Sequence, residues 1–149
     1  MRLSILAGLC LAWLLQAVPS TAAEFGTADE AKAMAERAVA LIASDGPEKA
    51  FAQFNDKSSS FHDRDLYVFV LDSKGVVAAQ GNNASLVGKS VINLRDVDGK
   101  PFIQEFVSVK EPTWIEYKWL NPQTKTVDAK ASFVIPVSSY YLGVGVYRK

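Results

Sequence analysis

The sequence predicts an α+β domain in which helices pack on an antiparallel β-sheet, and three observations support this fold class. First, residues 114–119, Val127–Val137 and Tyr140–Tyr147 are consecutive runs rich in aromatic and β-branched residues, separated by short turn segments. Such residues at every second position are typical of strands. Second, Leu66–Asp72 is a nearly continuous apolar run, as in a strand buried on both faces. Third, residues 28–44 carry apolar side chains at helical spacing.

Local signals predict the remaining elements. Thr27 and Glu30 have the spacing of a capping box and mark the start of the first helix. Pro47 and Pro101 suit the first turns of two further helices, whose apolar stripes we interpret as core residues. Residues 76–80 follow a glycine-containing turn and are expected to pair back on Leu66–Asp72 as a hairpin. The predicted order is two helices, two strands, an irregular segment with a short helix, and three strands.

Residues 1–23 are expected to be a secretory signal peptide. A charged start at Arg2 precedes an apolar run, and Pro19 and small residues follow it. The alternative is an uncleaved membrane anchor, but the run is short for a span and contains Ser4 and Gln16. We therefore expect cleavage after Ala23, a periplasmic or secreted location, and residues 24–149 as a single domain.

The composition of residues 24–149 excludes several classes of function. Cys10 is the only cysteine of the chain and lies in the apolar run, so the mature domain has no disulfide and no thiolate metal site. Loss of Arg2 leaves 15 basic against 16 acidic residues, which gives no reason to expect nucleic acid as a partner. With His62 as the only histidine, a catalytic triad or a multi-histidine metal site is excluded. We expect neither an enzyme nor a cofactor.

Several short stretches carry a family signal through their order and spacing. They are residues 67–75, 86–89, 93–96, 98–100, 116–119, 121–122, 129–133 and 143–147. Together they span about residues 24–149, and in this arrangement the chain resembles a stand-alone, periplasmic single Cache domain, the extracellular PAS-like sensor module of bacterial receptors. Gln80 is a departure, because the family often has histidine there.

The resemblance implies a PAS-like, five-stranded antiparallel sheet with a long N-terminal helix behind it. It also implies a small-molecule pocket between the front of the sheet and a loop-and-helix insert, with a small organic acid or a similar metabolite as the ligand. Because such domains drive chemoreceptors, kinases or cyclases, a membrane receptor or kinase is the expected partner. A homodimer through the N-terminal helix is a further expectation, with Ala35 and Ala38 either at the dimer seam or in the core behind the sheet.

Lys130 is the first candidate for ligand binding. It lies within a predicted strand, and the family pattern retains a basic residue at this position. A lysine that points into a cavity would provide a charge for a carboxylate. The alternative is an ordinary surface lysine on a strand. Arg95, in the irregular segment, is a reserve partner for an anion.

Aromatic residues are the other candidates. Tyr117 and Trp119 share a strand face, and Tyr67 and Phe69 share another, while Phe102 comes from the insert helix. Aromatic walls with a few polar groups are typical of small-ligand sites. The alternative for the four strand residues is packing in the core. Two functions therefore remain: a secreted ligand-binding sensor, or a structural or interaction protein that has the Cache fold with a filled core and no ligand.

Overall fold

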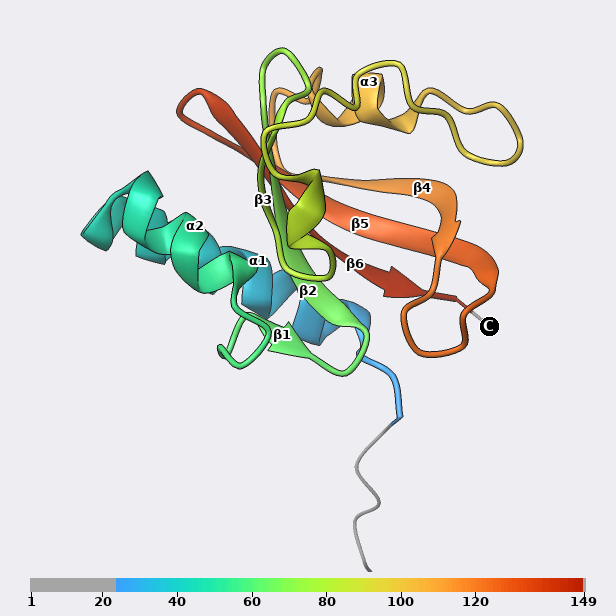
Figure 1. Ribbon diagram of the computed structural model, residues 1–149, viewed down its shortest axis with the longest axis horizontal. Helices are drawn as coiled ribbons and strands as arrows, with labels where there is room; N and C mark the ends of the chain where they lie inside the picture. The colour runs from blue at the N-terminus through green and yellow to red at the C-terminus, as the bar shows by residue number, and fades with distance from the viewer. Residues whose placement is uncertain (1–23, 149) are drawn as a thin grey trace, which may run out of the picture.

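One antiparallel sheet forms the middle layer of the structure (Figure 1). A computed structural model describes residues 24–148 of the chain. The sheet has six strands in the order β1-β2-β6-β5-β4, and β3 pairs with β2 beside β1. The strands are β1 (His62–Asp63), β2 (Leu66–Asp72), β3 (Val77–Gln80), β4 (Thr113–Leu120), β5 (Val127–Val137) and β6 (Tyr140–Tyr147).

The five predicted strands are present, and the prediction of an α+β fold is confirmed. β2 is buried at every position except its last, because one face is covered by helices and the other by the insert. β4 instead alternates between buried and exposed residues along much of its length, because it is the edge strand of the sheet. The two-residue β1 was not predicted, since a strand this short has no measurable period.

Two helices cover the back of the sheet, α1 (Ala28–Asp45) and α2 (Pro47–Asn55). The predicted capping box is confirmed: the Glu30 N–H donates to the Thr27 hydroxyl at 3.2 Å, and the Thr27 N–H donates to the Glu30 carboxylate at 2.8 Å. The buried residues of α1 are spaced by three or four positions, which directs one stripe of the helix at the sheet. They are Ala31, Met34, Ala35, Ala38 and Ile42.

The burial of this stripe decides between the two alternatives for Ala35 and Ala38. Ala35 and Ala38 are both 0% exposed in the single chain, where they pack in the core with residues of β2, β5 and β6. They are therefore core residues and cannot form a dimer seam. The small alanine side chains let the helix approach the sheet closely. A homodimer through α1 stays a prediction and would have to use the other side of the helix.

The front of the sheet is covered by the segment between β3 and β4, which contains the short helices η1 (Ala84–Leu86) and α3 (Phe102–Phe106) (Figure 1). Hydrogen bonds fasten this insert to the edge strand β4. The Asp96 carboxylate accepts from the Lys118 N–H at 3.0 Å, and the Lys100 ammonium donates to the Glu116 carbonyl at 2.5 Å. Lys118 also forms an ion pair with Asp98 at 2.8 Å. The insert is thus held over the front face as a cover.

The predicted signal peptide lies outside the described residues. Within residues 24–148, no helix has the length and apolar character needed to cross a membrane.

Candidate functional site

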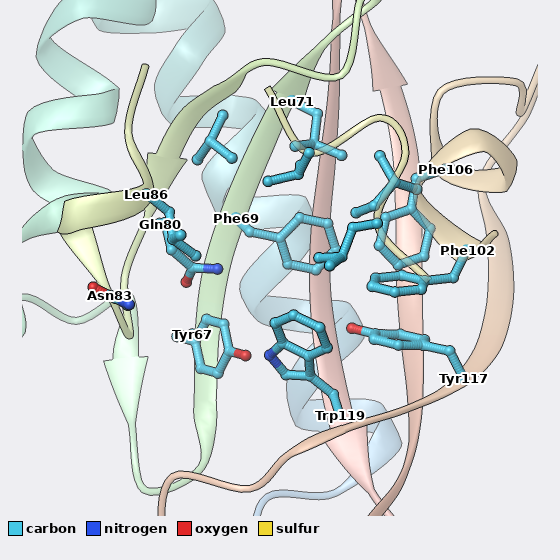
Figure 2. A pocket seen from close by; sticks show the side chains of 14 residues that line it. Tyr67, Phe69, Leu71, Gln80, Asn83, Leu86, Phe102, Phe106, Tyr117 and Trp119 are labelled. Atoms are coloured by element: carbon cyan, nitrogen blue, oxygen red, sulfur yellow. The ribbon is translucent and has the colours of Figure 1, made fainter. Parts of the chain in front are cut away.

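A pocket of about 370 Å³ lies between the front of the sheet and the insert (Figure 2). β2, β3 and β4 form one side of it, and η1, α3 and the loop between these two helices form the other. None of its lining residues carries a charged side chain. They are Tyr67, Phe69, Leu71, Val77, Gln80, Asn83, Leu86, Val91, Leu94, Phe102, Ile103, Phe106, Tyr117 and Trp119.

Five of the seven predicted site residues line this pocket: Tyr67, Phe69, Phe102, Tyr117 and Trp119. They converge because period two places the β2 and β4 residues on the front face, where the first turn of α3 brings Phe102 against them. Lys130 and Arg95 do not line it. Arg95 is exposed and donates to the Gly99 carbonyl at 2.8 Å, within its own loop.

Aromatic rings make up much of the pocket wall. Phe102 stacks on Tyr117, with ring centroids 4.4 Å apart and planes 8° from parallel. Phe69 stacks on Phe106 at 5.2 Å and 24°. Trp119 meets Phe102 edge-on at 5.5 Å. The rings hold one another in place, so the walls are preformed.

The polar groups of these aromatic residues gather at one end of the pocket. Figure 2 shows the indole nitrogen of Trp119 beside the Tyr67 hydroxyl, with the Tyr117 hydroxyl pointing into the same end of the pocket. The Tyr117 hydroxyl lies 3.0 Å from the Ser132 hydroxyl. This end therefore combines hydrogen-bonding groups with an otherwise apolar wall.

Lys130 lies beneath this polar end. β5 pairs it with Tyr117 on one side and Tyr147 on the other, which places it on the front face of the sheet, but its side chain is only 1% exposed. Its ammonium donates to the Tyr67 hydroxyl at 2.8 Å and to the Tyr147 hydroxyl at 3.2 Å. Two of its three N–H donors are thereby used. Because Tyr67 lines the pocket and Lys130 does not, the Tyr67 hydroxyl lies between the ammonium and the pocket.

Gly145 makes room for this lysine. A Cβ atom at Gly145 would overlap Lys130 Cε and the Ser132 hydroxyl. Because glycine has no side chain, Lys130 can cross β6 and reach Tyr67 on β2. On the same strand, Gly143 leaves space for the Phe69 ring. The two glycines thus position a charged group and an aromatic wall of the same site.

Burial dominates the electrostatics of the site. It lowers the pKa of Lys130 to about 7, and the nearby buried carboxylate of Asp65 opposes this shift. Burial also raises the pKa of the Tyr67 and Tyr117 hydroxyls well above the ordinary tyrosine value. Near neutral pH the lysine is therefore close to half-protonated, while both tyrosines keep their protons and can donate hydrogen bonds.

Gln80, noted in the sequence as a departure from the family pattern, lines the pocket from β3. Sequence reasoning missed Asn83, which lines it from the start of η1, and exposed Leu94, which lines it from the insert loop. No local pattern marks these two residues, because their position depends on how the insert folds back over the sheet. Phe106 could have been found, since it lies one helical turn after Phe102.

Comparison with known proteins shows similarity in sequence and in fold. Residues 20–149 match the family model described as Single Cache domain 2. A methyl-accepting chemotaxis protein from Vibrio parahaemolyticus is 25% identical with a TM-score of 0.69, over 80% of this chain and 86% of that chain. A periplasmic sensor domain of a chemotaxis protein is 22% identical with a TM-score of 0.63, over 81% and 90%.

A third solved structure is similar in fold. It is described as the structural basis for carboxylic acid recognition by a Cache chemosensory domain, and it is 20% identical with a TM-score of 0.63, over 79% of this chain and 86% of that chain. The comparison with curated proteins gave no match.

Proposed function

This chain belongs to the single Cache domain family, and we propose that it is a sensor module that binds a small organic acid in the pocket between sheet and insert. The observation that carries the proposal is the pair of tyrosine hydroxyls at one end of the pocket, with buried Lys130 hydrogen-bonded to one of them. The pocket volume of about 370 Å³ favours this function over a Cache fold with a filled core.

The hydrogen bonds around Tyr67 suggest how a carboxylate would be held. The Tyr67 oxygen accepts a hydrogen bond from the Lys130 ammonium at 2.8 Å, so its own O–H is left to donate to another acceptor. The Tyr147 hydroxyl also accepts from Lys130, at 3.2 Å, and is a neutral group. A ligand carboxylate would be a stronger acceptor for the Tyr67 proton because it is charged. Lys130 would then act on the ligand through Tyr67 rather than by direct contact.

Few groups in the structure compete with a ligand carboxylate for the charge of Lys130. The groups that face it are the two tyrosine hydroxyls, with the Asp65 carboxylate as the nearby negative charge. One Asp65 oxygen accepts from the Gly26 N–H at 2.6 Å, and Asp65 forms no ion pair with Lys130. A carboxylate above Tyr67 would add a second negative charge near the ammonium and favour its protonated form.

Membership of the family supports a wider role. A carboxylic acid is the ligand class stated for one Cache chemosensory domain of similar fold, and we extend this class to the present chain. We further propose that the domain acts in the periplasm, after removal of residues 1–23, and that it reports ligand binding to a membrane receptor or kinase.

A thermal-shift panel tests the proposed ligand class. Acetate, propionate, lactate, pyruvate and succinate would be added at pH 6.5, where Lys130 is mainly protonated. Ligand at about a hundred times its dissociation constant stabilises the folded state by roughly 2.7 kcal/mol. For a domain of this size we expect a rise in melting temperature on the order of 10 °C. If neither this panel nor the aryl acids considered below raise the melting temperature, the organic-acid function is wrong.

Two variants test the role of the polar end. Lys130→Met removes the charge at similar side-chain volume, and a lost charge-assisted hydrogen bond of roughly 1.5–3 kcal/mol corresponds to an affinity about tenfold to a hundredfold weaker. Tyr67→Phe should weaken binding by at least as much, because it removes the donor itself and with it the route through which Lys130 acts. Lys49→Met, at an exposed position of α2, is the control and should bind like the wild type. An unchanged affinity in both site variants would place the carboxylate elsewhere.

A further inference from the structure

The walls of the pocket indicate which chemical group the ligand has besides its carboxylate. Beyond the polar end, the lining is apolar and rich in phenyl rings, and Figure 2 shows Phe69, Phe102, Phe106 and Trp119 grouped around one region of the cavity. The Phe102–Tyr117 and Phe69–Phe106 pairs are each stacked, so flat ring surfaces and ring edges are both held in fixed orientations. Such surfaces favour another flat ring by stacked or edge-on contact.

The size of the pocket also favours a ligand that carries a ring. About 370 Å³ corresponds to roughly a dozen molecules the size of water, at about 30 Å³ each. A two- or three-carbon acid bound at the Tyr67 hydroxyl would leave most of this volume and most of the aromatic surface without contacts. One six-membered ring attached to the carboxylate would reach the phenylalanine rings and use this space.

The lining also limits what this ring can carry. No charged side chain lines the pocket, so a second charge on the ligand would lose its hydration without gaining a partner. The amide groups of Gln80 and Asn83 are the only polar side chains of the lining outside the polar end, and they lie on its β3 and η1 side. The lining therefore fits a ligand with a single charge at one end and an uncharged body.

From these observations we infer that the ligand is a monocarboxylate with one aromatic ring, of the benzoate or phenylacetate class. This inference rests on the proposed function for the carboxylate and goes beyond it by assigning the chemistry of the ligand's body. The carboxylate lies at the Tyr67 hydroxyl, and the ring lies among Phe69, Phe102 and Phe106.

Matched pairs of acids test the inference in the wild-type protein. Dissociation constants for benzoate, phenylacetate, cyclohexanecarboxylate, propionate and benzamide would be measured by calorimetry at pH 6.5. Cyclohexanecarboxylate has a similar size and the same charge as benzoate but no aromatic face. One favourable ring contact is worth about two- to twelvefold in affinity. With several rings in reach, we expect one of the aryl acids to bind at least about tenfold more tightly than cyclohexanecarboxylate or propionate.

The outcomes distinguish recognition of the ring from recognition of the carboxylate. If propionate or cyclohexanecarboxylate binds as tightly as both aryl acids, the aromatic ligand is wrong while the organic-acid function stands. If benzamide binds as tightly as benzoate, the carboxylate is not recognised and the proposed function fails, while the aromatic ring is supported. If none of the five compounds binds, the aromatic inference is overturned.

A variant of the wall provides a second readout. Phe102→Leu keeps an apolar side chain but removes the ring that stacks on Tyr117. We expect the preference for the aryl acid over cyclohexanecarboxylate to fall by at least about threefold, because one ring contact is lost. Phe51→Leu is the control, since Phe51 packs behind the sheet against Tyr140 and should leave the preference unchanged. The same preference in both variants would contradict binding of the ring at Phe102.

Discussion

Replacing Lys130 with methionine will remove a rise in stability with pH that the wild-type protein shows between pH 7 and about pH 9.5. Burial lowers the pKa of Lys130 from 10.5 to about 7 in the folded protein. In this window the folded protein has released a proton that the unfolded chain still holds. Unfolding then takes up a proton, so the free energy of unfolding increases with pH. Below pH 7 both states are protonated, and the charge of buried Lys130 destabilises the folded state.

The free energy of unfolding can rise by at most about 1.4 kcal/mol per pH unit for one proton, so the gain in stability between pH 7 and about pH 9.5 is on the order of 2–3 kcal/mol. Urea unfolding at intervals between pH 6.5 and pH 9.5 measures it. The difference in stability between the wild type and Lys130→Met isolates the lysine, because the buried tyrosines are common to both proteins. Lys49→Met, on the surface of α2, should keep the wild-type slope. Parallel curves for the wild type and Lys130→Met would show that the pKa of Lys130 is not lowered by burial.

The second large effect is expected at Gly145, where alanine should destabilise the fold by about 1–3 kcal/mol. The new methyl group would occupy the space of Lys130 Cε and the Ser132 hydroxyl, and neither can move far, since Lys130 and Ser132 are 1% and 0% exposed. Chemical denaturation measures the loss. The variant should also lose ligand affinity, because a displaced Lys130 no longer reaches the Tyr67 hydroxyl.

A double-mutant cycle identifies the cause of this loss. In the background Lys130→Ala together with Ser132→Ala, the methyl group at position 145 has room, so Gly145→Ala should cost much less than in the wild type. An equal cost in both backgrounds would mean that the strand requires glycine for its backbone rather than for the space taken by Lys130.

Local patterns were sufficient to predict the helices, the strands and the α+β class, while the arrangement of helix, sheet and insert came from the resemblance to the Cache family. Period two in β4 placed Tyr117 and Trp119 on one face of the sheet, and the capping box located the first residue of α1. The spacing in β5 also placed Lys130 on the opposite face from Ala131 and Phe133, which pack behind the sheet. These features depend on residues close in sequence, which is why they could be read from the sequence alone.

The depth of Lys130 could not be predicted, because it depends on residues far away in sequence. Its burial requires Tyr67, 63 positions earlier, to lie two strands away across Gly145. Only the order of strands in the folded sheet shows this arrangement. The position of Arg95, the reserve residue, could not be predicted either. The tight turn between Asp96 and Lys100 brings the Gly99 carbonyl to the Arg95 guanidinium, and the side chain stays outside the pocket. For Ala35 and Ala38, a stripe of small residues does not distinguish a dimer seam from a core.

The central claim is that a carboxylate in this pocket is recognised by the charge of Lys130 through Tyr67, and proton uptake on binding tests it most directly. At pH 8 the ligand-free protein has mostly neutral Lys130, and a bound carboxylate favours the charged form. Calorimetric titrations with the tightest-binding acid would be made in two buffers that differ in ionisation enthalpy. We expect uptake of between roughly half a proton and one proton per ligand in the wild type and none in Lys130→Met. Binding by the wild type without proton uptake, or with the same uptake in Lys130→Met, would contradict the account.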